Sequence, residues 1–567
     1  MKVSDYIVEY LIKKGITDAF GYPGGMVTHL MESFSKYNDQ IKAHVNYHEQ
    51  ASAFAACGYA QASGKVGVAY ATSGPGATNL ITGICNAYFD SIPCLFITGQ
   101  VNTFESKGNY KVRQRGFQET DVVNMTKDIT KYSAYVESEQ KIKYYLDKAF
   151  YEACNNRPGP VLLDIPMNIF RAEIDPDKLI GYKINETINY NVDINTKLVS
   201  ALKISKRPCF LIGNGVKISR NQYKMKQIID KLKLPVVSSM IAFDTLNDCK
   251  WNFGFIGAYG NREANFIAAK SDLIISIGSR LDIRQVGVNR SNFAPNAKIL
   301  RIEIDDGEIS YKLHDDEIVI KCDILDVLDV LNNMDFETKY NEWRNVCLEL
   351  EKELYDDTLR KPNDFVKKIS HLVPENALIT TDVGQNQVWV AQSFDLKNGQ
   401  EVLFSGGHGA MGYSLPAAIG AYYANRNRSV VSINGDGGIQ MNIQELQFIA
   451  REQLPIKIIV FNNAALGMIR HFQEMYFNSN YFQTKAEGGY TTPELSLIAN
   501  AYGIRSFCIN DIDELHDNGI FIDDKPVFIE IKINENTYVF PKLEFGKPNQ
   551  DQEPLIDRAK YERLMNL

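Results

Sequence analysis

Short apolar runs of strand length alternate with segments of helical periodicity along the whole chain. The runs are rich in β-branched residues and many close on Gly or Pro, which is typical of buried parallel strands. Three of them are VGVAYATSG at 66–74, SDLIISIGS at 271–279 and IKIIVFNN at 456–463. The alternation predicts an α/β fold built from doubly wound parallel sheets.

Two interruptions of this pattern divide the chain into three α/β domains. Residues 170–192 are polar and non-periodic, and residues 330–357 form a charged, largely helical segment. We place the three domains at residues 1–172, 190–335 and 360–545. The tail at residues 546–567 is polar and partly basic, which makes it a candidate cover for an active site.

Composition and charge exclude several classes of function. A chain of 567 residues is too long for one core, and its net charge of -8 includes no basic run that would track a phosphate backbone. Nucleic acid is therefore not an expected partner. No apolar run is long enough to span a membrane, and the charged, amphipathic start does not resemble a signal peptide. The nine cysteines include no CxxC pair and sit mostly in apolar runs, so we expect a cytoplasmic protein without disulfides.

The strongest chemical signal lies between residues 428 and 468. The strand RSVVSIN leads into GDGG at 435–438, and a helix and a second strand then lead to Asn462-Asn463. Both clusters therefore follow parallel strands, at the sheet edge where ligands bind. The glycines let the backbone approach a diphosphate, and the Asp436 and Asn463 oxygens suit Mg²⁺. Each motif alone is more often a turn, but the pair on one unit predicts a magnesium-diphosphate site.

With GDG followed about thirty residues later by NN, the chain resembles the thiamine diphosphate-dependent enzymes along nearly its whole length. It is most similar to the acetolactate (acetohydroxyacid) synthase-like large subunits. The resemblance implies a pyrimidine-binding domain, a central nucleotide- or FAD-binding-like domain and a diphosphate- and magnesium-binding domain, in that order. It also implies three metal ligands, namely the Asp436 and Asn463 side chains and the Ala465 carbonyl.

Two further blocks of the third domain match the family, FSGGHGAMGYSLPAAIGA at 404–421 and TDVGQNQVW at 381–389. The Met411 side chain is implied to wedge the cofactor into a bent conformation. The family usually has histidine where this chain has Asn386, whose amide can still donate to phosphate. The implied cofactor-binding residues here are Gly384, Gln385, Asn386, Gly409, Met411, Gly435, Asp436, Gly437, Gly438, Asn463, Gly467 and Met468.

The first domain supplies an acid, Glu49, in YHEQASAFAACGYAQASGK at 47–65. Its position at a helix start would by itself indicate an acid favoured by the helix dipole. The resemblance instead implies the family's catalytic glutamate, which shares a proton with the aminopyrimidine and promotes formation of the cofactor's ylid. His48 is expected to be structural, and the helix's small residues are expected to permit close packing.

ATSGPGATN at 71–79 resembles the adjoining pyrimidine-side loop, with Thr72 and Asn79 as its polar members. Glu49 and Asp436 belong to different domains, and in the family these domains face each other across subunits. The resemblance therefore implies a homodimer or homotetramer.

The central domain contains GAYGNREAN at 257–265 and GSRLDIRQVG at 278–287, which resemble flavin-binding stretches. Tyr259 and Arg262 differ from the usual residues, and several members of the family bind no flavin there. FAD without a redox role is the expectation. The implied flavin-binding residues are Gly213, Gly257, Arg280, Arg284, Glu303 and Asp323.

The substrate pocket departs from the common pattern. Gly25 resembles the loop over the thiazolium, and Gln118 beside Phe117 matches a glutamine at the acceptor end. Met167 stands where synthases have lysine, and Phe472 where they have tryptophan. Nearby, Arg470 and His471 could meet an anionic or polyhydroxylated acceptor, or could equally face solvent on a helix.

We predict magnesium-dependent decarboxylation of a 2-oxo acid, with pyruvate preferred, and transfer of the acyl carbanion to an acceptor carbonyl. Gly25, Glu49, Gln118 and Met411 are the candidate catalytic residues. Three alternatives stay open. The acceptor could be a keto-sugar or aldehyde of a surface-polysaccharide pathway. The chain could be a simple decarboxylase or oxidase, with His408 as the candidate acid. A non-catalytic regulatory subunit is the third, against which the intact Glu49, Asp436, Asn463 and Met411 speak.

Overall fold

The computed structural model describes residues 1–184, 193–334, 339–355, 361–516 and 519–567. Within these ranges the strands form three parallel sheets of six strands each, which confirms the predicted fold class. The chain divides into two compact units. One contains the first and third sheets, and the other contains the central sheet with residues 388–400 and 536–567. The predicted domain limits at residues 190, 335 and 360 fall outside the described residues.

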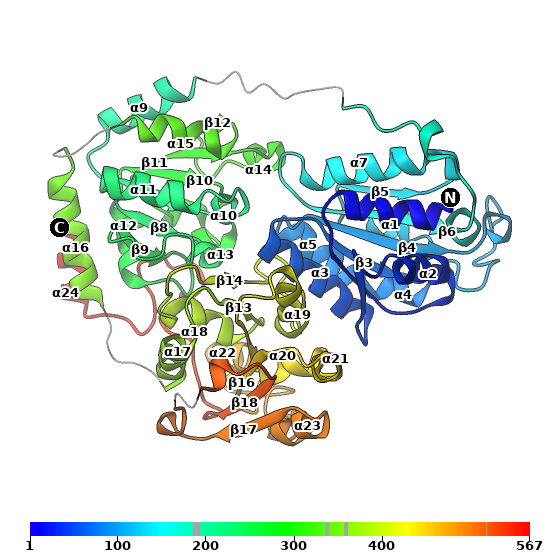
Figure 1. Ribbon diagram of the computed structural model, residues 1–567. Helices are drawn as coiled ribbons and strands as arrows, with labels where there is room; N and C mark the ends of the chain where they lie inside the picture. The colour runs from blue at the N-terminus through cyan, green and yellow to red at the C-terminus, as the bar shows by residue number, and fades with distance from the viewer. Residues whose placement is uncertain (185–192, 335–338, 356–360, 517–518) are drawn as a thin grey trace. The chain divides into compact units, whose positions relative to one another are not determined.

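The first sheet has the order β2-β1-β3-β4-β6-β5. Successive side chains of a strand point to opposite faces, so Leu95 and Ile97 of β4 join one core, whereas Cys94 and Phe96 join another. Helices α1 and α7 cover the first of these faces, and α3 and α5 the second (Figure 1). The strands are β1 Asp18–Gly21, β2 Lys42–Val45, β3 Gly67–Ala71, β4 Cys94–Gln100, β5 Tyr132–Tyr135 and β6 Pro160–Pro166. The helices are α1 Val3–Lys13, α2 Thr28–Lys36, α3 Glu49–Ser63, α4 Pro75–Asn79, α5 Ile81–Phe89, α6 Val122–Thr126, α7 Ile142–Cys154 and α8 Met167–Phe170.

The third sheet repeats this connectivity in the order β14-β13-β15-β16-β18-β17. Because β13, β15 and β16 are neighbours and parallel, the loops that follow them share one edge of the sheet. The strands are β13 Leu378–Thr381, β14 Glu401–Leu403, β15 Val430–Gly435, β16 Ile456–Asn462, β17 Arg505–Ile509 and β18 Val527–Lys532. The helices are α18 Gln385–Ser393, α19 Ser414–Ala424, α20 Asp436–Met441, α21 Glu445–Glu452, α22 Gly467–Tyr476 and α23 Leu495–Ala501.

Helices α3 and α19 cross at very close range and join the first and third sheets into one core. A methyl group on Gly58 would collide with the Ala417 carbonyl, and one on Gly420 with the Ala55 carbonyl. Only residues without a side chain permit this approach of two backbones. The expectation that the small residues of α3 allow close packing is confirmed.

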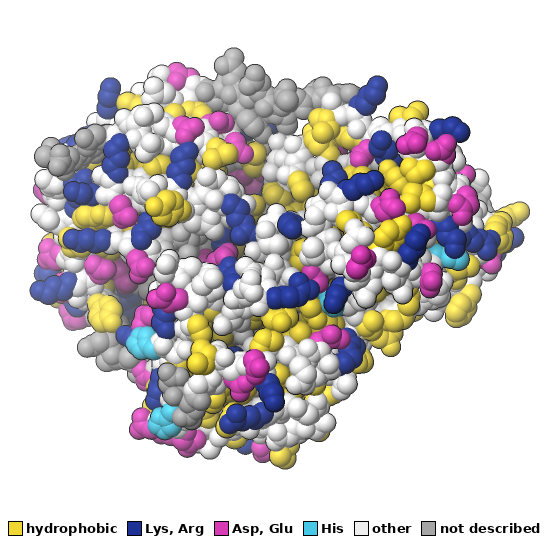
Figure 2. Space-filling view, in the orientation of Figure 1, with side chains coloured by type: hydrophobic (Ala, Val, Ile, Leu, Met, Phe, Trp, Pro, Cys, Tyr) yellow, Lys and Arg dark blue, Asp and Glu magenta, His cyan; other side chains and the backbone are white. Residues whose placement is uncertain are grey.

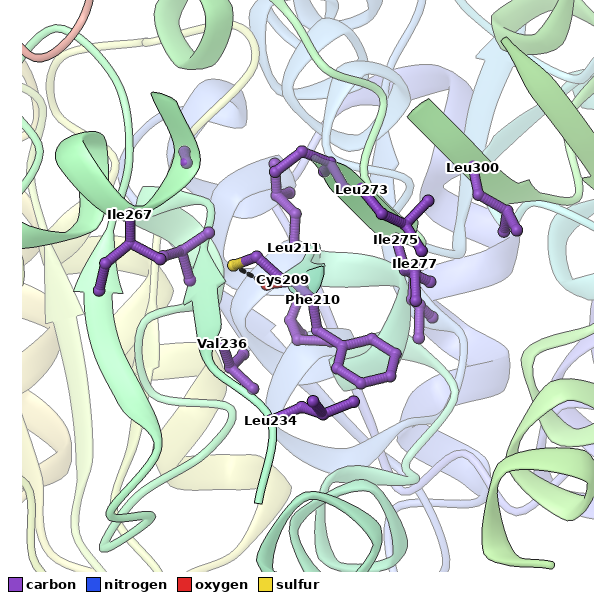
Figure 3. Packing of buried hydrophobic residues seen from close by; sticks show 14 of the residues in the cluster. Cys209, Phe210, Leu211, Leu234, Val236, Ile267, Leu273, Ile275, Ile277 and Leu300 are labelled. Atoms are coloured by element: carbon purple, nitrogen blue, oxygen red, sulfur yellow. Dashed lines mark hydrogen bonds between the residues drawn. The ribbon is translucent and has the colours of Figure 1, made fainter. Parts of the chain in front are cut away.

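The central sheet has the order β12-β11-β10-β7-β8-β9, which is the doubly wound order with its switch point between β7 and β10. Figure 3 shows its core, where Phe210 of β7 lies among Val236, Ile275 and Ile277. The strands are β7 Pro208–Ile212, β8 Val236–Ser238, β9 Asn252–Phe255, β10 Leu273–Ile277, β11 Lys298–Glu303 and β12 Ile318–Lys321. The helices of this unit are α9 Ile194–Ile204, α10 Asn214–Ile218, α11 Gln222–Leu232, α12 Arg262–Lys270, α13 Ile283–Val286, α14 Asp306–Ser310, α15 Ile324–Asn332, α16 Asn341–Leu354, α17 Lys361–Leu372 and α24 Arg558–Asn566.

The C-terminal tail is attached to the central domain. Leu564 of α24 is fully buried in the central core. Lys270 Nζ donates to the Met565 carbonyl at 2.7 Å, and Arg262 donates to the carbonyls of Gln552 and Pro554. Arg262, unusual for the family, thus anchors the tail. The tail's role as an active-site cover stays a prediction.

Charged side chains of both signs lie on the surface. On the face shown in Figure 2, Lys and Arg side chains are interspersed with Asp and Glu. None of the helices in the described part of the chain combines the length and apolarity needed to cross a membrane.

Candidate active site

Asp436 is the first residue of α20, directly after β15, and only 4% of it is exposed. Its Oδ1 accepts the Gly437 N–H at 2.8 Å. Its Oδ2 is buried and has no hydrogen-bond partner among the described residues. Burial raises the pKa of Asp436 to about 7, partly offset by the N–H groups of Gly437, Ala465 and Ala464. A cation at Oδ2 would pair this orphaned oxygen and favour the charged carboxylate.

The two asparagines after β16 have different tasks. Asn462 Nδ2 donates to the buried Glu530 at 2.7 Å, which fixes the strand end. Asn463 Oδ1 accepts the Ala465 N–H at 3.2 Å, and its Nδ2 donates to Gln385 Oε1 at 3.1 Å. The N–H groups of Ala464 and Ala465, which follow Asn463, also stabilise the Asp436 carboxylate. The Asn463 turn therefore lies beside Asp436, and the two side chains could supply two oxygen ligands to one Mg²⁺.

Asp382, immediately after β13, supports the site and was not among the predicted residues. Its fully buried carboxylate accepts N–H bonds from Val383 at 2.7 Å and from Gly412 at 2.9 Å. Gly438 packs so closely on this carboxylate that a Cβ there would collide with it. Burial raises the pKa of Asp382 to about 7. Asp382 thus joins the loop that carries Met411 to the GDGG turn. The sequence did offer a signal for this residue, since Asp382 follows an apolar strand and precedes Gly384 by two positions.

The loop after Asp382 packs against the asparagine turn, and the binding of the diphosphate by Gly384 and Gln385 stays a prediction. A Cβ on Gly467 would collide with the Gln385 side chain. The amide nitrogen of Asn386 donates to the carbonyls of Asp382 at 2.9 Å and Ile433 at 3.4 Å, which holds β13 against β15. Its contact with the diphosphate stays a prediction.

Met411 reaches the same edge of the sheet. Its methyl carbon lies 3.2 Å from the point where a Cβ on Gly437 would stand, beside the Leu466 side chain. Gly409 has a φ of 68° and open space around it. Met468 is the second residue of α22, and its side chain is half-buried. The predicted residues of the third domain are therefore gathered around the ends of β13, β15 and β16.

A second cluster forms around Glu49 at the start of α3. His48 caps this helix, since its Nδ1 accepts the Gln50 N–H at 3.1 Å, so its structural role is confirmed. Glu49 is 8% exposed, and its Oε2 accepts from Asn79 Nδ2 at 2.9 Å. A Cβ on Gly76 would lie 3.2 Å from Glu49 Oε1 and 2.9 Å from Thr72 Cγ2. The structure thus brings Glu49, Thr72 and Asn79 together at the carboxyl end of β3.

Gly25 and Gln118 lie at the rim of this cluster. Thr72 Oγ1 accepts the Met26 N–H at 3.2 Å, which holds the loop of Gly25 against Thr72. Gln118 has a φ of 63° and packs on Gly74, the glycine that precedes α4. Gly25 itself is exposed, with open space where a side chain would stand.

Comparison with known proteins agrees with both clusters. The family models described as "Thiamine pyrophosphate enzyme" match with their N-terminal TPP binding domain at residues 1–125, their central domain at 196–331 and their C-terminal TPP binding domain at 382–531. The chain belongs to the thiamine pyrophosphate enzyme family. Thiamine pyrophosphate, or thiamine diphosphate, is therefore its cofactor.

Several curated relatives align along nearly the whole chain. The acetolactate synthase large subunit of Lactococcus lactis is 34% identical, with 96% of this chain and 94% of the relative covered. The acetolactate synthase isozyme 2 large subunit of Escherichia coli is 33% identical, with 97% and 99% covered. The probable acetolactate synthase large subunit of Methanocaldococcus jannaschii is 35% identical, with 94% and 92% covered. The chain is thus an acetolactate synthase-like member of this enzyme family.

In this thiamine pyrophosphate enzyme the buried Glu445 of α21 links the two clusters. It accepts from Asn46 Nδ2 at 2.9 Å and from the Tyr47 N–H at 2.8 Å, just before Glu49. Asn442, which follows α20, donates to Gln50 at 3.1 Å. Burial raises the pKa of Glu445 to about 7. Sequence reasoning missed Glu445 because its partners lie nearly 400 residues away.

The residues expected to line the substrate pocket differ widely in burial. Arg470 is fully buried and pairs with Glu474 at 3.2 Å, and His471 is only 6% exposed, so the solvent-facing alternative is wrong. Phe472 is 37% exposed, with its ring centre 4.7 Å from that of Tyr476. Phe117 is 78% exposed, and Met167 is half-buried at the start of α8.

His408, the candidate acid of a simple decarboxylase, is poorly suited to that task. Its ring stacks on Phe89 with 5.8 Å between ring centres. Burial lowers the pKa of His408 below that of a free histidine, which favours the neutral ring that has no extra proton to give.

In the central domain, Gly213 after β7 meets Gly278 after β10 at the switch point. Gly215 N–H donates to the Gly278 carbonyl at 3.0 Å, and a Cβ on Gly213 would collide with that carbonyl. At the end of β8, the buried hydroxyls of Ser238 and Ser239 have no hydrogen-bond partner within the described ranges. These orphaned hydroxyls lie where doubly wound sheets bind dinucleotides.

The remaining predicted flavin residues lie at or beyond the carboxyl ends of β9 to β12, with Glu303 the last residue of β11 and Arg284 in α13. A Cβ on Gly257 would collide with the Arg284 carbonyl, and Arg280 pairs with Asp282 at 3.4 Å. Glu303 accepts the Ile304 N–H at 2.9 Å. Asp323 caps α15 by accepting the Leu325 N–H at 2.9 Å. The two acids are thus engaged with their own backbone, whereas both arginine side chains reach the surface.

Proposed function

We propose that this enzyme decarboxylates a 2-oxo acid, with pyruvate as the first candidate, and transfers the acyl carbanion to an acceptor carbonyl. The single observation that carries the proposal is the orphaned Asp436 Oδ2 beside the Asn463 turn, because it fits a metal-bound diphosphate. The relatives named acetolactate synthase support pyruvate as donor and as acceptor.

The residues at the ends of β15 and β16 fit Mg²⁺. Asp436 Oδ2, the Asn463 side-chain oxygen and the Ala465 carbonyl would hold the ion. These are hard oxygen donors of the kind that Mg²⁺ shares with phosphate oxygens. When bound, thiamine diphosphate supplies the electron sink for loss of carbon dioxide. Because Gly437, Gly438 and Gly467 lack side chains, the neighbouring side chains can pack directly on the turns that would hold the diphosphate.

Glu49 would hold the proton that the aminopyrimidine ring exchanges. Asn79 fixes one carboxylate oxygen at 2.9 Å, which leaves Oε1 to face the ring near Gly76. A largely buried carboxyl in this position can donate or accept a proton at Oε1, as general acid–base catalysis requires. In the family, the pyrimidine-binding domain of one subunit faces the diphosphate-binding domain of another. We therefore also propose a homo-oligomer, either dimer or tetramer.

A product assay tests the reaction. Purified enzyme with Mg²⁺ and thiamine diphosphate is given pyruvate alone and pyruvate with a panel of 2-oxo acids, aldehydes and nucleotide-linked keto-sugars. We expect carbon dioxide release and a carboligation product identified by mass. Acetaldehyde as the only product would contradict the ligase proposal and would make the enzyme a simple decarboxylase.

One observation favours the second candidate, acyl transfer to an anionic keto-sugar. The loop before Gln118 is built on Glu119, which accepts N–H bonds from Lys107 at 2.7 Å, Arg115 at 3.1 Å and Gly116 at 3.2 Å. The loop exposes Tyr110 and Phe117. Its Lys111 and Arg113 are exposed and form no ion pair with any described residue. Flat rings and free cations beside the acceptor end suit a nucleotide-linked sugar.

The double variant Lys111→Ala/Arg113→Ala tests this second candidate. If an anionic acceptor binds the loop, its KM should rise by about tenfold at low salt and by less at high salt. Carbon dioxide release from pyruvate alone should not change. The control is Lys42→Ala/Lys127→Ala, which removes two exposed cations of the same domain. Equal KM values in both double variants would reject the loop's role.

We also propose that the central domain binds FAD at the β7–β10 switch point. The orphaned Ser238 and Ser239 hydroxyls, and the close approach of the Gly213 and Gly278 turns at the switch point, support a dinucleotide there. The purified protein should be yellow. Ser238→Ala/Ser239→Ala should retain several-fold less flavin per chain than Ser310→Ala, an exposed serine of the same domain. A colourless wild-type protein that does not take up added FAD would contradict this assignment.

A further inference from the structure

Tyr490 lies in the segment between α22 and α23, whose backbone is held firmly in place. Its N–H donates to the Lys485 carbonyl at 3.0 Å. Gly488 packs so closely on the Tyr481 carbonyl that any side chain there would collide with it. Lys485 is only 6% exposed and pairs with Glu535 at 2.8 Å. The segment therefore presents the Tyr490 ring in a defined position.

The Tyr490 hydroxyl is buried and has no hydrogen-bond partner among the residues that the structure describes. It lies 3.1 Å from the point where a Cβ on Gly437 would stand, and the Met411 methyl carbon lies 3.2 Å from the same point. A buried tyrosine hydroxyl normally has a partner. Its natural partner is therefore a molecule that enters this site.

The hydroxyl is suited to donate. A tyrosine hydroxyl keeps its proton at neutral pH and can therefore act as a hydrogen-bond donor. Two orphaned atoms, Asp436 Oδ2 and Tyr490 Oη, thus flank Gly437, and they do not pair with each other. The first needs a cation, and the second offers a proton to an anion.

A magnesium diphosphate supplies both partners at once. We propose that the Tyr490 hydroxyl donates a hydrogen bond to a diphosphate oxygen of the cofactor while Asp436 holds the magnesium. This assignment rests on the magnesium-diphosphate site proposed above, and it makes Tyr490 a cofactor-binding residue. The Met411 and Leu466 side chains lie beside the same point, and apolar surroundings strengthen such a bond.

The variant Tyr490→Phe removes only the hydroxyl. We expect it to weaken the binding of magnesium thiamine diphosphate by about tenfold, the typical effect of one hydrogen bond to a charged group. The Kd is measured by equilibrium dialysis against the apoenzyme. Inorganic pyrophosphate with Mg²⁺, which has the diphosphate but no rings, is measured in the same way and should lose the same factor.

The matched control is Tyr502→Phe, a half-buried tyrosine of the same domain at the end of α23. It should leave both Kd values unchanged. A Tyr490→Phe variant with unchanged Kd values, or with only the thiamine diphosphate Kd weakened, would overturn the assignment to the diphosphate. If the wild-type enzyme binds the cofactor but forms no ligation product, the proposed reaction fails, while the Kd comparison still tests Tyr490.

Discussion

Asp436→Asn is expected to weaken the binding of magnesium thiamine diphosphate by about a hundredfold or more and to abolish carbon dioxide release at ordinary cofactor concentrations. The carboxylate provides the only negative charge in the proposed ligand set, and its Oδ2 is the orphaned oxygen that awaits a cation. Equilibrium dialysis of the cofactor at several Mg²⁺ concentrations measures the change. The exposed Asp524→Asn in the same domain serves as a surface control.

A second buried acid gives a sharper comparison. Asp382 is buried like Asp436, and burial raises both pKa values to about 7. The Asp382 carboxylate is already satisfied by the N–H groups of Val383 and Gly412. Asp382→Asn should therefore lower the melting temperature of the apoenzyme, because an amide nitrogen would face two donors. Asp436→Asn should leave it unchanged or raise it, since an unpaired charge is lost. A fall in both variants would contradict the assignment of Asp436 to a ligand.

Glu49→Gln is expected to lower the rate of carbon dioxide release from pyruvate by about 10²–10⁴-fold, the range attributed to one acid–base group. The amide keeps an oxygen for the contact with Asn79 but cannot exchange a proton. The Kd of magnesium thiamine diphosphate should change only slightly, because Glu49 lies in a different domain from the diphosphate residues. Rate and Kd are measured on the same preparations, with the exposed Glu452→Gln as control. Equal rates in Glu49→Gln and wild type would reject the proton-transfer role.

Mixing the two inactive variants tests whether subunits share a site. If Glu49 of one chain serves Asp436 of another, random reassociation of Glu49→Gln with Asp436→Asn should restore about a quarter of the wild-type activity in a dimer. Half of the dimers would then be mixed, and each would hold one intact site. No recovery after verified exchange of subunits would show that both groups act within one chain.

The sequence alone predicted the fold class and the diphosphate cluster. Strand-length apolar runs and the rule that loops after parallel strands share an edge were enough to place Asp436 beside Asn463. Both residues belong to one strand–helix–strand unit, so local patterns determine their neighbourhood. Glu49 is different. Its position at a helix start is ordinary, and only the family resemblance assigned it a proton-transfer role.

Other residues became visible only in three dimensions. The contacts of Asp382 with Gly412, of Glu445 with Asn46 and of Tyr490 with Gly437 join segments that are distant in sequence, and hydropathy carries no information on such contacts. Helical periodicity likewise did not reveal that Arg470 of α22 is fully buried.

The sequence by itself determined three doubly wound sheets and the residues at the ends of β15 and β16, because those depend on local periodicity and strand order. The cofactor family followed from the resemblance of its motifs. Tertiary structure decided which buried polar atoms remain unpaired, that Asn386 bonds to backbone, and that the tail belongs to the central domain. The burial and hydrogen bonding of a side chain depend on which distant segments pack together, and only the tertiary structure determines that packing.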